Sequence, residues 1–212
     1  MAVTVGPTPA TDGRAHRAQG TRSAILAAAV ELGSLRGLEE LSMGGLASTV
    51  EMSKSGLFAH FGSKQELQLA TIAEAWEIFE QEVLRPRPDD ADNDLGAMLE
   101  RWLSFHERKV FPGGCFFTIS AVEFAGRRGA VSQALAAALE RQTAALESAV
   151  HRAGERGEIR VRRNASQIAF GLQSILATAD SLYRLHGDPL VFEHARATIS
   201  ELLGHRPTGP GA

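Results

Sequence analysis

Apolar residues recur every three or four positions along most of the chain, which is the period of a helix that buries one face. The first such stripe runs from Ile25 to Leu35 and ends near Gly37. No segment shows the alternation of a half-buried strand, and no segment is repeated. The pattern predicts an all-α protein of about nine helices, over residues 21–36, 43–50, 54–61, 64–83, 95–110, 115–125, 131–152, 165–186 and 189–203.

Residues that favour helix ends support these boundaries. Ser42, Ser53 and Ser63 each precede a predicted helix, where a serine hydroxyl accepts a hydrogen bond from a free backbone amide. Ser63 and Glu66 also have the spacing of a capping box, in which the glutamate reaches back to the start of the helix. Before the last helix, Asp188-Pro189 supplies a cap followed by proline at the first helical position.

These elements divide the chain into four parts. Residues 1–20 are rich in Gly, Pro, Thr and Ala, so we expect a disordered arm there, and a disordered Pro/Gly-rich tail over residues 205–212. Between them we expect a three-helix head over residues 21–66 and a larger helical body over residues 67–204. No linker separates head from body, and we therefore expect them to move as coupled units.

The segment over residues 41–69 carries the most informative pattern. Two short amphipathic helices joined by a three-residue turn describe a helix-turn-helix, whose second helix can enter the major groove of DNA. Leu57 and Phe61 are four residues apart and are expected to face the core of the head. Phe58 and His60 are left on other faces, where they either contact DNA or are plain surface and packing residues.

The start of the second helix carries the side chains suited to a phosphate backbone. Lys54, and Lys64 at the next helix start, are the cations in position, and Ser53 and Ser55 are short hydroxyl donors. Gly56 allows close approach of the backbone. The predicted DNA-binding residues are Ser42, Gly45, Ser53, Lys54, Ser55, Gly56, Phe58, His60 and Lys64.

Composition changes this picture only slightly. The net charge is −3, and the head end is the less acidic part: residues 1–64 carry six Lys/Arg and five Asp/Glu, against sixteen and twenty in residues 65–212. Affinity for DNA must then come from a few placed cations and not from a broad positive field. Cys115 is alone, which excludes a disulfide framework, and neither a signal peptide nor a run of about 18 apolar residues is present. We expect a cytoplasmic protein without a membrane span.

Sequence motifs for catalysis are lacking. Gly62-Ser63-Lys64 is not a phosphate-binding loop, because that motif needs glycine, then lysine, then Ser/Thr after a strand. The chain has no nucleophile-elbow, HExxH or CxxC pattern, and nothing pairs Glu123 or Asp180 with a base. We therefore expect no enzymatic activity, no metal and no cofactor.

The order of residues in the head resembles the DNA-binding domain of the TetR family of bacterial transcriptional regulators. The resemblance covers residues 21–69. It rests on Leu41-Ser42-Met43, Leu46-Ala47, Ser53-Lys54, Leu57-Phe58, His60-Phe61 and Ser63-Lys64-x-x-Leu67. It implies a homodimer that binds a palindromic operator, represses transcription and is released by a small-molecule effector bound in the body. The alternative is a helix-turn-helix-derived ligand- or protein-binding module with weakened DNA affinity.

Two places depart from the family pattern. The family usually has glycine in the turn, where the residue tends to adopt a positive φ, whereas this chain has Glu51. A non-glycine residue there costs on the order of 1 kcal/mol, and the carboxylate repels phosphate. Gly44 and Gly45 lie in the helix before this turn. Each weakens that helix by about 1 kcal/mol relative to alanine and offers no side chain to DNA. The sequence thus predicts reduced affinity on an intact fold.

Aromatic residues gather in the predicted body and, with a few polar side chains, have the composition of a small-molecule pocket. An ordinary packed core is the alternative for each of them. The predicted effector-binding residues are Trp76, Phe79, Trp102, Phe105, His106, Cys115, Phe117, Phe124, Phe170 and Gln173.

The last two predicted helices have broad apolar faces. The resemblance implies that they build a two-fold, four-helix dimer interface, and burial against the protomer's own body is the alternative. The predicted interface residues are Leu172, Ile175, Leu176, Ala179, Tyr183, Phe192, Ala195, Ile199 and Leu202.

Overall fold

The computed structural model of the chain describes residues 12–86, 95–159 and 164–204. Within these ranges all regular structure is helical, which confirms the predicted all-α class. The elements are α1 (Asp12–Arg36), α2 (Met43–Thr49), α3 (Lys54–His60), α4 (Lys64–Phe79), the π-helical turn η1 (Glu80–Leu84), α5 (Leu95–Glu107), α6 (Phe116–Phe124), α7 (Ala130–Glu155), α8 (Ala165–His186) and α9 (Leu190–Leu202).

The largest difference from the predicted boundaries is at the start of α1. This helix begins at Asp12, so the expectation of a disordered arm is wrong for residues 12–20. Ala, Arg and Gln in that stretch favour helix, and packing of Ile25 and Ala29 anchors the same helix farther along. The rest of the expected arm, residues 1–11, and the expected tail, 205–212, lie outside the described residues.

The predicted caps explain where the short helices begin. The hydroxyl oxygens of Ser42 and Ser53 accept hydrogen bonds from the backbone amides three residues on, at 3.1 and 3.0 Å. Ser63 does the same for the amide of Glu66, at 3.1 Å. The Glu66 carboxylate reaches back as expected, but it accepts from the amide of Gly62, at 2.9 Å, one residue earlier than in a capping box.

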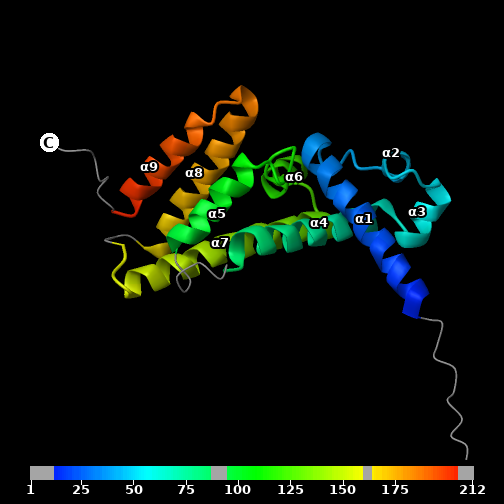
Figure 1. Ribbon diagram of the computed structural model, residues 1–212, viewed down its shortest axis with the longest axis horizontal. Helices are drawn as coiled ribbons and strands as arrows, with labels where there is room; N and C mark the ends of the chain where they lie inside the picture. The colour runs from blue at the N-terminus through cyan, green and yellow to red at the C-terminus, as the bar shows by residue number, and fades with distance from the viewer. Residues whose placement is uncertain (1–11, 87–94, 160–163, 205–212) are drawn as a thin grey trace, which may run out of the picture.

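The helices form a small head, α1–α3, and a longer body, α4–α9 (Figure 1). α4 leaves the head and runs along α7, α8 packs against α7, and α9 packs against α8. One continuous apolar core passes through both parts, from Leu46 and Leu57 in the head to Phe105 and Phe192 in the body. Among the described helices, none combines the length and the apolar character needed to span a bilayer.

The head is attached to the body at the C-terminal end of α1. The carboxylate of Glu123, on α6, accepts hydrogen bonds from the backbone amides of Leu38, at 2.7 Å, and Glu39, at 3.4 Å. Nearby, the amide of Gly113 donates to the hydroxyl of Ser34 at 2.9 Å. A Cβ on Gly113 would lie 1.6 Å from the Ser34 carbonyl oxygen, so only glycine allows this approach.

A buried contact between an aspartate and a histidine holds the loop that makes this contact. Asp180, on α8, lies 3.3 Å from Nδ1 of His106, on α5, and accepts a hydrogen bond from the backbone amide of Cys115 at 2.9 Å. Both side chains of the pair are almost fully buried. Arg184, one turn farther along α8, donates to the carbonyl oxygen of Pro112 at 2.7 Å. Residues 112–115 are therefore fixed between α1 and α8.

We predict that Glu123→Ala destabilises the protein by about 1–3 kcal/mol, because the amide of buried Leu38 loses its acceptor. Glu123→Gln keeps a side-chain oxygen and should retain most of the stability. Urea unfolding followed by circular dichroism measures both. Glu140→Ala, at an exposed site on α7, is the control, and equal midpoints for Glu123→Ala and Glu140→Ala would contradict the role of Glu123.

We also predict an acid-sensitive contribution from Asp180. Burial opposes its ionisation, but the hydrogen bond and charge of His106 and the amide of Cys115 outweigh burial, so the pKa of Asp180 is lowered. A lowered pKa stabilises the fold above the unfolded-state value, near 3.9, and this stability is lost as the pH falls through the folded-state pKa.

Asp180→Asn should remove that part of the pH dependence and lower stability at pH 7. Urea unfolding between pH 7 and pH 3 measures it. Ser181→Ala, at the exposed neighbouring position, should keep the wild-type profile. Parallel profiles for wild type and Asp180→Asn would show that Asp180 makes no such contribution.

Candidate functional site

The helix-turn-helix has the geometry that its sequence predicts. Leu57 is fully buried and Phe61 is 2% exposed, so both face the core of the head. Between α2 and α3, Glu51 adopts a φ of +53°, and the amide of Met52 donates to the carbonyl oxygen of Ala47 at 2.9 Å. The turn thus requires the positive φ that favours glycine, and Glu51 holds it with the strain of a non-glycine residue.

The start of α3 presents a polar face to solvent. Ser53, Lys54 and Ser55 are exposed, and the hydroxyl groups of the two serines are 3.1 Å apart. Phe58 is 42% exposed, so it is not a core residue of the head, and His60 is half-buried. Ser42, Gly44 and Gly45 are exposed on the neighbouring helix α2. These residues are accessible to DNA, and their contacts with it remain a prediction.

Lys64 is engaged by the protein itself. Its ammonium group donates to the backbone carbonyl of Glu39 and lies 3.7 Å from the carboxylate of the same residue. Arg127 contacts that carboxylate as well, at 3.1 Å. Lys64 therefore fixes the start of α4 against the segment after α1, and its charge is already partly balanced.

A cation that the sequence analysis did not select lies beside the end of α3. The guanidinium of Arg22 donates to the carbonyl oxygen of His60 at 2.8 Å and lies over the ring of Phe61, 4.3 Å from its centre. This contact joins α1 to the C-terminus of α3. Residues 37–63 otherwise contain a single Lys or Arg, Lys54, so few cations lie around the predicted DNA face.

The predicted effector residues of the body divide into a packed cluster and scattered positions. Trp76, Phe79, Trp102, Phe105 and Phe117 are buried and their rings contact one another; Phe79 lies 4.8 Å from Trp102 and 5.9 Å from Phe105. Rings in such contact fill the space between α4, α5 and α6 and form an ordinary core in this conformation.

Other predicted effector residues lie apart from the aromatic cluster. Phe170 is 73% exposed on the outside of α8, so the prediction that it lines an internal pocket is wrong. Phe124 lies at the end of α6 with Arg127 over its ring, and Gln173 accepts a hydrogen bond from Thr143 between α7 and α8. Cys115 is buried in the loop described above, and burial raises the pKa of its thiol.

Three buried polar atoms in the core have no hydrogen-bond partner within the described part of the chain. They are Nε1 of Trp76 on α4, Oγ of Ser120 on α6 and Nε2 of Gln142 on α7. Such atoms are costly to bury unless something bonds them. Neither Ser120 nor Gln142 is among the residues predicted from the sequence. Gln142 had a detectable signal, because it falls on the same helical stripe as Leu135 and Leu146.

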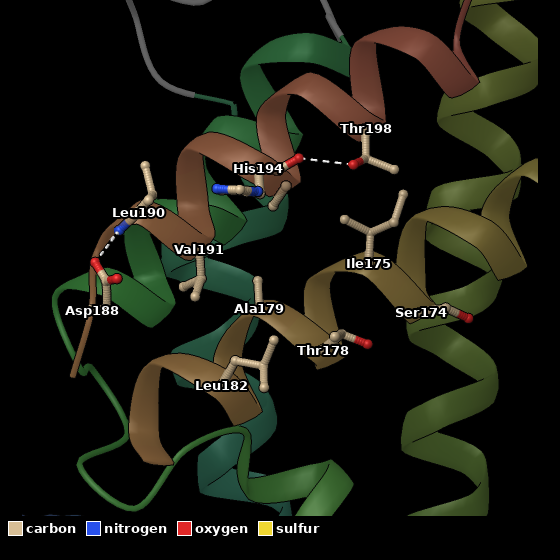
Figure 2. A pocket seen from close by; sticks show the side chains of 11 residues that line it. Ser174, Ile175, Thr178, Ala179, Leu182, Asp188, Leu190, Val191, His194 and Thr198 are labelled. Atoms are coloured by element: carbon tan, nitrogen blue, oxygen red, sulfur yellow. Dashed lines mark hydrogen bonds between the residues drawn. The ribbon is translucent and has the colours of Figure 1, made fainter. Parts of the chain in front are cut away.

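The outer surfaces of α8 and α9 enclose a groove of about 510 Å³. Figure 2 shows Ile175, Ala179 and Leu182 of α8 on one side and Val191 and His194 of α9 on the other. Leu182 and Leu190 of the lining are exposed, and Leu185, three residues after Leu182 on α8, is a further exposed apolar side chain. A contiguous apolar surface of this kind marks an interaction site.

Burial within the protomer corrects part of the predicted dimer-interface set, and the interface itself remains a prediction. Leu172, Leu176 and Phe192 are fully buried in the protomer, so they cannot contact a second chain, and the ring of Tyr183 packs on Phe192 at 4.9 Å. Ile175, Ala179 and Ala195 do line the groove. Ile199 is 7% exposed, and Leu202 is half-buried, with Gly171 beneath it. The groove residues that the sequence analysis missed are Ser174, Thr178, Leu182, Asp188, Leu190, Val191, His194 and Thr198.

Comparison with solved structures finds other proteins with this fold. The chain is similar to a TetR transcriptional regulator from Chloroflexus aurantiacus, with 22% identity and a TM-score of 0.79 over 90% of this chain and 98% of that one. It is similar to a TetR-family regulator from Agrobacterium tumefaciens, with 19% identity and a TM-score of 0.77 over 87% and 98%. AibR, solved in complex with isovaleryl coenzyme A and operator DNA, has 24% identity and a TM-score of 0.69 over 86% and 98%.

Comparison with family models covers both parts of the chain. Residues 25–71 match the model described as bacterial regulatory proteins, tetR family. Residues 93–199, half of the chain, match the model described as tetracyclin repressor-like, C-terminal domain. No curated protein matches significantly. The helix-turn-helix and the helical body each have their counterpart in the same family, and the chain therefore belongs to the TetR family of bacterial transcriptional regulators.

Proposed function

We propose that this regulator is a repressor that binds palindromic operator DNA as a dimer and leaves it when a small molecule binds the body. The observation that carries the proposal is the exposed polar face of α3 on a head fixed to the body through α1 and α4. Ser53, Lys54 and Ser55 are placed for phosphates, and Phe58 is exposed beside them for a sugar or a thymine methyl. Gly56 lets the backbone approach DNA closely.

A dimer is needed because one seven-residue helix reads too few base pairs. Two-fold symmetry places two such helices on half-sites about one DNA turn apart, which makes the operator a palindrome. The α8–α9 groove supplies the surface: it is apolar, and it lies at the far end of the molecule from the head (Figure 1). A second copy of α8 and α9 would complete a four-helix interface there.

Release of DNA is proposed to begin in the aromatic core. Trp76, Ser120 and Gln142, on α4, α6 and α7, carry buried polar atoms that have no partner among the described residues, so a ligand with polar groups can gain hydrogen bonds there. α4 also carries the head, and α6 holds it through Glu123. A ligand that separates these helices would change the spacing of the two heads and favour the state that does not fit the operator. The similar AibR structure, with isovaleryl coenzyme A and operator DNA bound, supports this two-site scheme.

A second candidate function has specific support. Glu51 places a carboxylate in the turn before α3, Gly44 and Gly45 offer no side chains, and Lys64 is bound by Glu39. These features favour a helix-turn-helix protein that has lost most DNA affinity and acts through a ligand or a protein partner. DNA binding by the purified dimer separates the two functions.

We predict that the protein retards a DNA fragment from upstream of its own gene, in a band-shift assay at low salt. Lys54→Gln should weaken binding and lower the slope of log K against log salt by about 0.9 per protomer, because one phosphate contact is lost. Glu51→Gly should tighten binding, since it removes a negative charge near phosphate and relieves the strain at φ +53°.

Two controls sharpen this test. Glu51→Gln removes the charge but keeps the strained turn, so it separates electrostatic repulsion from backbone strain. Arg128→Gln removes an exposed cation of the body and should leave the salt slope unchanged. Failure of the wild-type protein to bind any upstream fragment at low salt would favour the ligand- or protein-binding alternative.

We predict that Leu182→Asp weakens dimerisation by on the order of 100-fold, because symmetry buries the new charge twice. Leu182 is 40% exposed in the protomer, so the change should leave the protomer folded. Val122→Asp, at an apolar position on α6 that is 75% exposed, is the matched control and should not alter dimerisation. Sedimentation equilibrium measures the association, and a dimer equally stable in both variants would place the interface elsewhere.

A further inference from the structure

The helix α3, which presents the predicted DNA face, is held to the rest of the head by few side chains. Of its seven residues, all of them in the described part of the chain, Leu57 alone is buried. Phe61, which follows the helix, is buried as well. The last carbonyl groups of a helix have no acceptor role within the helix and need another donor. The position of α3 therefore depends strongly on what holds its C-terminal end.

Arg22, on α1, holds that end by two contacts at once. Its Nη1 donates to the carbonyl oxygen of His60, the last residue of α3, at 2.8 Å, and its guanidinium carbon lies 4.3 Å from the centre of the Phe61 ring. A cation is favourable at the C-terminus of a helix, where the free carbonyl groups carry partial negative charge, and the face of an aromatic ring also attracts it. The planar guanidinium makes both contacts in a fixed geometry, which the ammonium group of a lysine does not reproduce.

The other end of α1 is fixed to the body (Figure 1). The amide of Gly113 donates to the hydroxyl of Ser34 at 2.9 Å, and the amide of Leu38 donates to the carboxylate of Glu123 at 2.7 Å. Ser34 and Arg22 lie on one uninterrupted helix, about 18 Å apart along its axis at a rise of roughly 1.5 Å per residue. α3 is thus connected to the body through Arg22 and α1, in addition to the chain that enters α4.

We infer that Arg22 is a positioning residue for operator recognition, which holds α3 in the orientation that fits the base edges. The inference rests on the proposed function, because it takes the exposed face of α3 as the surface that reads the operator. Arg22 is not among the predicted DNA-binding residues and acts through His60 and Phe61. Specific binding requires side chains placed against base edges, whereas non-specific binding depends on the positive charge near phosphates. A variant that keeps the charge but loses the two contacts should therefore lose specific binding alone.

Hydrogen exchange of the full-length protein, measured by nuclear magnetic resonance without DNA, tests whether Arg22 holds α3. The amides of Leu57 and Phe61 donate to carbonyl groups at the start and in the middle of this helix. Arg22→Lys should raise their exchange rates about tenfold, because α3 then opens locally more often. The amides of Leu46 and Val50, which bond in the same way in α2, should keep their rates. Unchanged rates in α3, or equal acceleration in α2, would overturn the inference.

Band shifts with two DNA fragments test the consequence for recognition. One fragment comes from upstream of the gene, and the other has the same length and composition in scrambled order. Arg22→Lys should weaken binding to the upstream fragment about tenfold and leave the affinity and salt slope for the scrambled fragment unchanged. Arg36→Lys, at an exposed position on the same helix, is the matched control and should behave as wild type on both fragments.

The outcomes distinguish a failure of this inference from a failure of the proposed function. Equal weakening on both fragments would show that Arg22 acts on phosphates and not on the position of α3, which would overturn the inference. A wild-type protein that binds both fragments equally would contradict the proposed function and, with it, a role of Arg22 in recognition. The exchange rates in Arg22→Lys would then still show whether Arg22 holds α3.

Discussion

The orientation of the head depends on the hydrogen bonds from two backbone amides after α1 to the carboxylate of Glu123. The amides of Leu38 and Glu39 follow Gly37, which comes directly after α1 and has a φ of +97°, and the buried Leu38 amide needs an acceptor. Within the described residues, Glu123 of α6 supplies it. A Cβ at residue 37 would lie 1.7 Å from the same carboxylate, so the turn and the acceptor require each other.

The body has to be fixed before it can fix the head. The buried pair of Asp180 and His106 joins α8 to α5, and Asp180 also binds the loop that leads into α6. The polar contacts therefore form a chain from α8, through residues 112–115, to α1. The aromatic core lies beside this series of polar contacts. Burial of the aromatic rings stabilises the fold without fixing how the helices are oriented, whereas the hydrogen bonds fix that orientation. A rearrangement of the core thus reaches the head through a few identifiable bonds.

Helical period and capping residues predicted the elements of this fold well, because both depend on neighbours in sequence. Ser42, Ser53 and Ser63 cap the helices that they precede. The site was harder to predict. Periodicity finds the most apolar stripe of α8, which contains Leu172 and Leu176, and that stripe faces the protomer's own core.

The groove lies on the neighbouring face of α8. That face mixes leucine with serine and threonine, so its pattern is not distinctive in a sequence. Contacts across the fold were beyond reach for the same reason. No pattern in the sequence pairs Lys64 with Glu39, 25 residues away, or Arg22 with the end of α3.

The α4–η1 segment connects the two ends of the molecule. Leu84, at the end of η1, lines a small cavity between η1, α5 and α7, Trp76 lies in the aromatic core, and Lys64 starts α4 against the head. The last turn of this segment is a π-helix, whose wider hydrogen-bond pattern can return to an α-helix when one residue is shifted. Such a shift would rotate the side chains that precede it relative to those that follow. A change in the contacts of Leu84 therefore acts on the same continuous helical segment that positions Trp76 in the core and Lys64 against Glu39 in the head.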